Sequence, residues 1–127
     1  MNINRLILAG FLVALLTAAA PACADPEALG TLIRITKNLE HYPTEEDNVV
    51  LKAIVDSDDS TEEEAAIAMA LSNMQHTVTA GDAERLQDIV DDDLSNVTAR
   101  MLAGILLKIK HSPGDDDQAA LAKLAGE

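Results

Sequence analysis

A repeat of 35 residues constrains the fold of this chain more than any other feature. Residues 48–82 and 83–117 align without a gap and share ten identical residues. Parts of a third copy flank them, because His41 stands 35 residues before His76 and Leu121 stands 35 residues after Leu86. A period of this length is typical of stacked helical units, each of which buries its apolar face against its neighbours.

Each unit predicts two helices joined by an acidic turn. The first helix has its apolar residues at helical spacing in "EEDNVVLKAIVD" and "DAERLQDIVD", and the second in "TEEEAAIAMALSNMQH" and "NVTARMLAGILLKIKH". A helix over about 26–41 precedes the two units, and another over about 117–125 follows them. We therefore expect an all-α fold without strands, a short α-α solenoid of about six helices whose terminal half repeats cap the stack. The residues expected to face inward include Leu86, Ile89, Leu102 and Leu106.

Short polar residues mark the expected helix starts. Ser60 with Glu63 three residues later has the spacing of a capping box, and Ser95 takes the same place one unit on. Thr44 and Asp47 form another such pair. Asp25-Pro26 predicts a cap and a first-turn proline at the start of the helix over 26–41.

The repeat unit resembles a HEAT-type repeat, of the short kind found in small bacterial proteins. The resemblance rests on an apolar first helix ("LQDIV"), an acidic turn ("DDDLS") and a second helix opening "VTARMLAGIL", with Arg100 near the arginine favoured in that family. The other copy has Ala65 at that place. The resemblance covers about residues 48–125 and implies a scaffold that binds other proteins, without catalytic residues.

The first 24 residues have the pattern of a secretory signal peptide. A single charge at Arg5 precedes the apolar run 6–20, and small residues at Ala22 and Ala24 provide a cleavage site. We expect cleavage after Ala24, a helical-repeat domain over residues 25–127, and a periplasmic or secreted address without membrane insertion. Lipid attachment at Cys23 is the alternative.

Charge and composition narrow the classes of partner. The formal net charge is −13, and loss of Arg5 with the leader changes it to −14. Such acidity disfavours nucleic acid and favours a basic protein partner. Tyr42 is the single aromatic residue after residue 24, whereas most cofactor and small-molecule pockets are rich in aromatic side chains. We therefore expect no cofactor.

The sequence shows no pattern typical of a catalytic or metal site. It has no G-x-S-x-G, H-E-x-x-H or C-x-x-C motif, so we expect no enzyme activity and no metal site. His41, His76 and His111 are each expected in the last turn of a helix, stabilised by the helix dipole. In a solenoid they would lie about one repeat apart, too far to share one ion. The acidic stretch after Asp56 departs from a calcium loop, which leaves weak surface calcium binding as an alternative.

These observations predict an exported protein-binding module that docks on a basic partner. An immunity protein that inhibits a secreted cell-wall-degrading toxin fits its size, charge and address. A periplasmic chaperone or assembly adaptor and a carboxylate-rich metal or cation binder are the alternatives. The predicted contact residues are the acidic turns inside the repeats, where stacking would align carboxylates into a negative field: Asp56, Asp58, Asp59, Asp91, Asp92 and Asp93. A second acidic edge carries Glu45, Glu46, Asp47, Asp82, Asp115, Asp116 and Asp117.

Overall fold

The computed structural model describes residues 26–127. The predicted signal peptide and Cys23 lie outside the described residues. Within residues 26–127, no helix has the length and apolar character needed to cross a membrane.

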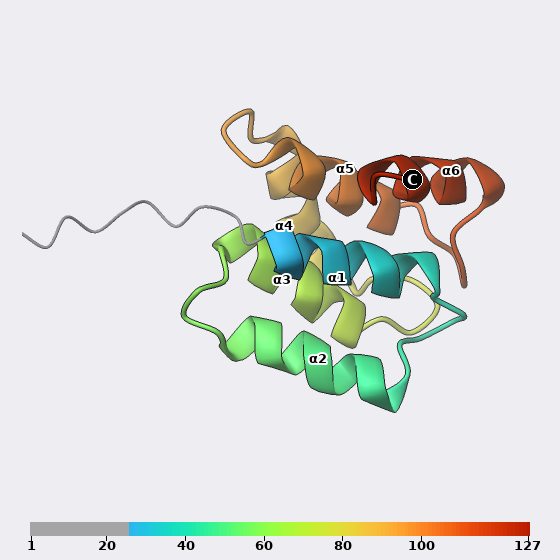
Figure 1. The fold of residues 1–127 in the computed structure, drawn as a ribbon, viewed down its shortest axis with the longest axis horizontal. Coiled ribbons are helices and arrows are strands. Elements are labelled where there is room, and N and C mark those ends of the chain that lie inside the picture. Colours follow the sequence, from blue (N-terminus) through green and yellow to red (C-terminus); the bar gives the residue numbers. More distant parts are fainter. Residues whose placement is uncertain (1–25) are drawn as a thin grey trace, which may run out of the picture.

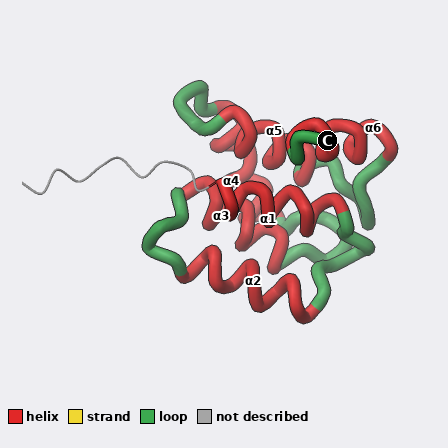
Figure 2. The backbone as a smooth tube through the Cα atoms, in the orientation of Figure 1, coloured by secondary structure: helices red, strands yellow, loops and turns green. Residues whose placement is uncertain are grey.

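Residues 26–127 form six α-helices and no β-strand, which confirms the all-α prediction (Figures 1 and 2). The helices are α1 (Pro26–Lys37), α2 (Glu45–Asp56), α3 (Glu62–Ser72), α4 (Ala80–Asp91), α5 (Val97–Leu106) and α6 (Asp115–Leu124). Helices α2 and α3 form one complete repeat, and α4 and α5 form the other.

The helices close on themselves, and a linear stack is not confirmed. α1, α3 and α5 each contact the other two and form an inner group. α2 and α4 lie outside and pack against α3 and α5. α6 packs against α1, so the last and first helices together form the third unit. Gln118 strengthens this closure by donating to the Lys37 carbonyl at 2.8 Å, and Lys37 forms an ion pair with Glu127.

The interior is aliphatic and runs through all three units. Leu51, Leu86 and Leu121 occupy one repeat position and are all fully buried. The four residues predicted to face inward, including Leu102 and Leu106, are buried as expected. Burial of such side chains contributes about 1.5–3 kcal/mol each, so the aliphatic contacts hold the three units together.

The helix caps follow the predicted chemistry, with two changes of register. Thr44 caps α2 and accepts from the Asp47 amide, as expected. The box before α3 is formed by Thr61 and Glu64, one residue later than predicted, and Asn96 in place of Ser95 caps α5. The shift has a physical reason: Glu64 is fully buried, so its Oε2 can reach back to the Thr61 amide, whereas Glu63 is only half-buried.

Candidate metal centre

Three histidines lie in the loops that join the inner helices to the outer ones. His41 follows α1, His76 follows α3 and His111 follows α5. The helices end at Lys37, Ser72 and Leu106, so the prediction that each histidine occupies the last helical turn is wrong. The three loops gather at one end of the helices, on the right of Figure 1. We call His41, His76 and His111 the histidine centre.

The backbone of the histidine centre forms a closed ring of hydrogen bonds. The His41 amide donates to the His111 carbonyl at 2.6 Å. The His111 amide donates to the His76 carbonyl at 2.7 Å, and the His76 amide donates to the His41 carbonyl at 3.2 Å. Each histidine therefore gives one bond and receives one. The ring satisfies three amides and three carbonyls that lie outside the helices, and it fixes the loops relative to one another.

Each histidine of the ring has a left-handed backbone. The φ angles are 76° at His41, 73° at His76 and 77° at His111, and these are the non-glycine residues with positive φ in residues 26–127. Glycine adopts this conformation without strain, whereas a residue with a side chain is destabilised there by about 1–3 kcal/mol. Histidine, like asparagine and aspartate, adopts this region more readily than most residues with a side chain. Glycine would still suit the backbone better, so the recurrence of histidine at all three places points to a role for the imidazole.

The three imidazoles converge on one point. Each offers a ring nitrogen, and the three nitrogens lie within 4.8 Å of one another. The ring centroids are 5.4 Å apart for His41 and His76, 5.2 Å for His41 and His111, and 4.7 Å for His76 and His111. The prediction that these histidines lie too far apart to share an ion is therefore wrong. It assumed a linear stack, whereas closure of the helices brings equivalent positions together around one axis.

The donor set of the histidine centre fits a transition metal ion. Zinc binds imidazole nitrogen at about 2.0–2.1 Å, so two nitrogens on one tetrahedral ion lie about 3.3 Å apart. His76 Nδ1 and His111 Nδ1 are 2.9 Å apart, and the whole set spans no more than 4.8 Å. The spacing required for tetrahedral zinc lies between these two distances. All three residues are exposed, so an ion held by them would keep a coordination position open to solvent.

The repeat itself carries a signal for this site that motif patterns do not include. When residues 26–56, 61–91 and 96–126 are aligned, all three copies agree at three positions: His41/His76/His111, Asp47/Asp82/Asp117 and Leu51/Leu86/Leu121. The leucines form the core, and Asp47 and Asp82 bond to the caps of their own helices. The exposed histidines lie outside the core and cap no helix, and their rings pack edge-to-face on one another.

Acidic side chains follow each histidine of the histidine centre along the chain. α2, α4 and α6 begin four residues after His41, His76 and His111, and their first turns contain the second acidic edge. Asp82 is buried and bonds to Asn73, Thr79 and Arg85. The exposed members are Glu45, Glu46, Asp115 and Asp116, which we call the acidic collar. Lys110 is a basic neighbour. The collar gives this end of the molecule a negative potential that attracts cations.

The predicted contact residues lie at the other end of the helices. Asp58 and Asp59 are in the turn 57–61, and Asp92 and Asp93 are in the turn 92–96, on the left of Figure 1. Asp56 and Asp91 end the helices that lead into them. We call 57–61 and 92–96 the far turns.

Several carboxylates in or next to the far turns already have partners. Asp56 pairs with Lys52 at 2.7 Å, and Asp93 pairs with Arg100 at 3.1 Å. Asp92 shapes its own turn, because its carboxylate accepts from the Leu94 amide at 2.9 Å and from the Ser95 hydroxyl at 3.1 Å. These carboxylates therefore stabilise the local structure of their own repeats.

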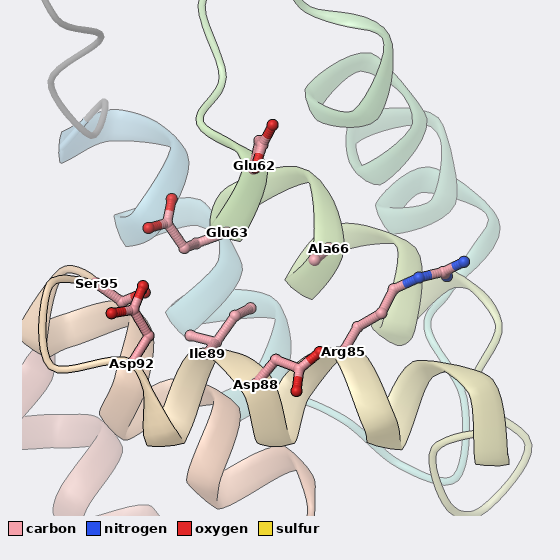
Figure 3. Close-up of a pocket in the computed structure, with 8 residues that line it drawn as sticks. All are labelled: Glu62, Glu63, Ala66, Arg85, Asp88, Ile89, Asp92 and Ser95. Atoms are coloured by element: carbon pink, nitrogen blue, oxygen red, sulfur yellow. The ribbon is translucent and has the colours of Figure 1, made fainter.

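A groove of about 320 Å³ lies between α3 and α4, next to the far turns (Figure 3). Glu62 and Glu63 line one side, and Asp88 and Asp92 line the other. Arg85 extends away from these carboxylates, toward the ion pair with Asp82. The groove is therefore acidic.

The second far turn and the start of α5 also expose apolar side chains. Leu94 is 95% exposed, Val97 67% and Met101 47%. The equivalent positions one repeat earlier are Asp59, Glu62 and Ala66, so this apolar patch belongs to one repeat only.

No protein-family model matches the chain, and neither the curated proteins nor the solved structures include a significant match to it.

Proposed function

We propose that this protein binds a divalent transition metal ion through His41, His76 and His111. The observation that carries the proposal is the convergence of three exposed imidazoles, with their nitrogens within 4.8 Å, at three backbone positions that disfavour side chains. Imidazole suits zinc, copper and nickel, whereas magnesium and calcium prefer oxygen donors. Zinc, bound by three nitrogens and one water, is the best fit to the donor number.

The alternative of a purely structural cluster explains less. The backbone ring uses only amides and carbonyls, so it can form with any residue that tolerates positive φ, such as asparagine or glycine. The contact between His76 Nδ1 and His111 Nδ1 engages two of the three side chains, and His41 adds only edge-to-face ring contacts with both. A metal ion gives all three imidazoles the same role.

The test is calorimetric titration of Zn²⁺ into residues 25–127 and into a variant with His41→Asn, His76→Asn and His111→Asn. Asparagine tolerates the left-handed backbone and removes the imidazole, so the variant should keep its helical circular dichroism. We expect one zinc ion per chain for the native protein and loss of that binding in the variant. Equal binding by both proteins would contradict the proposal.

A second candidate function is docking on a basic protein through the far turns. The observation that favours it is Leu94, which is 95% exposed at the tip of an acidic turn and close in sequence to Val97. An apolar anchor with an acidic rim suits a partner whose contact surface combines basic and apolar residues. The partner proposed here is a secreted cell-wall hydrolase, which the chain would inhibit.

Kinetics at two ionic strengths test the docking proposal, with the protein that co-purifies from the native host as partner. Asp91→Asn with Asp93→Asn should slow association and flatten its salt dependence, because rim charges act mainly on encounter. Leu94→Ser should mainly speed dissociation. Asp92 is left intact because it shapes the turn. Unchanged rates in both variants would assign the far turns to solubility alone.

The proposal also covers where the protein is located and which kind of repeat it contains. We propose a periplasmic or secreted address, supported by the signal-peptide pattern of residues 1–24. The HEAT-like character of the repeat is supported by the paired helices and by Arg100, whose Nε donates to the Val90 carbonyl at 3.2 Å inside its own repeat. Intact mass from the native host should correspond to a chain starting at Asp25; a lipid-modified chain starting at Cys23 would contradict simple cleavage.

A further inference from the structure

We infer that the metal ion is exchangeable cargo, passed directly to an acceptor that carries nitrogen or sulfur donors, and is not a structural ion. This inference rests on the proposed metal binding and adds what the protein does with the ion. Three features of the described residues support it: a backbone ring that holds the loops without an imidazole nitrogen, a group of three exposed histidines, and the exposed carboxylates of the acidic collar at the same end of the helices.

The fold has its own supports at the histidine centre. The backbone ring ties the three loops together through bonds of 2.6, 2.7 and 3.2 Å without using an imidazole nitrogen. Pro43 and Pro113 are buried beside His41 and His111, and Met74 is buried two residues before His76. Structural zinc sites, by contrast, supply the folding energy of their domains through four protein ligands.

The coordination sphere is incomplete. Within residues 26–127, the group that could hold an ion contains only the three histidines, and all three are exposed. Water must complete the sphere of a bound zinc ion, and zinc can expand to five ligands. A donor from an acceptor can therefore bind the ion before any histidine leaves it.

Transfer then proceeds by ligand exchange with no change of oxidation state. A bond from the acceptor nitrogen or sulfur to the metal forms, and the bound water leaves. Further acceptor donors then replace the three imidazoles one at a time, and the ion keeps its charge of two throughout. Any proton on an acceptor donor passes to solvent, because metal ligands must be deprotonated. The vacated imidazoles return to the hydrogen-bonded arrangement of His76 and His111.

The experiment measures the rate at which zinc leaves the loaded protein for a chromophoric pyridylazo chelator. If exchange is direct, a tenfold rise in chelator concentration should raise the transfer rate about tenfold, since the entering ligand takes part in the rate-limiting step. A rate independent of chelator concentration would show that the ion must first dissociate, and this would overturn the inference.

Two controls separate this inference from the proposed function. Absence of zinc binding in the calorimetric titration would remove the proposed function itself, whereas binding with a concentration-independent transfer rate removes only the inference. The metal-free protein should show the same helical circular dichroism as the loaded protein. Unfolding of the metal-free protein would assign the ion a structural role and would also overturn the inference.

Discussion

The Nδ1 atoms of His76 and His111 face each other at 2.9 Å, although the two residues stand 35 positions apart in the chain. One of these nitrogens must carry a hydrogen and the other must accept it. A metal ion bound at both Nδ1 atoms would require the hydrogen to move to Nε2 in the donor ring. The contact therefore predicts a tautomer change on metal binding.

Nitrogen-15 NMR of labelled histidine can follow this change. On addition of one equivalent of Zn²⁺, the Nδ1 signals of His76 and His111 should shift together, and both Nε2 atoms should carry hydrogen. Gln75 and Lys110 precede these histidines, and their backbone amide signals in a second, uniformly labelled sample check that the loops stay in place. Unchanged ring nitrogens in the presence of zinc would contradict coordination at these atoms.

Removal of one imidazole should weaken the ion site without unfolding the protein. We expect His76→Asn to lower zinc affinity by at least about 100-fold, because even residues that only orient ligands change affinity by about 10–100-fold. Gln75→Ala, next to it in the same loop, is the control and should leave the affinity within a few-fold. Calorimetric titration checks both variants.

Metal selectivity should follow the imidazole donors. Cu²⁺ should bind more tightly than Zn²⁺, and Mn²⁺ more weakly than either. Mg²⁺ and Ca²⁺ should not compete, because they prefer oxygen ligands. Competition titrations at fixed pH give this order. Displacement of zinc by calcium at similar concentration would instead favour the carboxylates as the site.

The acidic collar should speed metal capture. Glu45→Gln with Glu46→Gln removes two charges from the first turn of α2, at the histidine end. Stopped-flow association of Zn²⁺ should slow by about 2–5-fold at low salt, because a negative field raises the local cation concentration. Glu62→Gln with Glu63→Gln removes two charges from the first turn of α3, at the opposite end, and should change the rate much less. Equal slowing of zinc association in both double variants would show that net charge alone, and not the position of the collar, sets the rate.

Core leucines should carry much of the stability. Leu106 is fully buried, so Leu106→Ala should lower the free energy of unfolding by about 2–5 kcal/mol. Leu94→Ala makes the same chemical change at a side chain that is 95% exposed and should stay within about 0.5 kcal/mol. Chemical denaturation of the two variants compares them directly. Similar losses would contradict the described packing.

The helices, caps and core could be predicted because they depend on local chemistry. Apolar spacing is enough to place α2 and α5, and Thr44 with Asp47 marks a helix start wherever the helix lies. The cap positions before α3 and α5 missed by one residue, since Ser, Thr and Asn can all serve and burial of Glu64 decides among them.

Closure of the helices could not be read from the period. A repeat of 35 residues specifies that the units are alike but leaves open the rotation between neighbours, which depends on side-chain packing across the unit boundaries. Contact between α1 and α6 decides it, and these helices lie at opposite ends of the described chain. Without closure, His41 and His111 have no reason to meet. The left-handed φ at each histidine also has no local cue such as glycine.

The number of repeat copies limits the number of equivalent metal donors in the histidine centre. Each unit contributes one equivalent residue to the ring of His41, His76 and His111, so a chain of three copies presents three like donors. A fourth like donor would require a fourth copy, a wider ring and a different inner group of helices. Threefold internal symmetry therefore leaves the fourth place of a tetrahedron outside the repeat, to be filled by whatever molecule approaches along the axis.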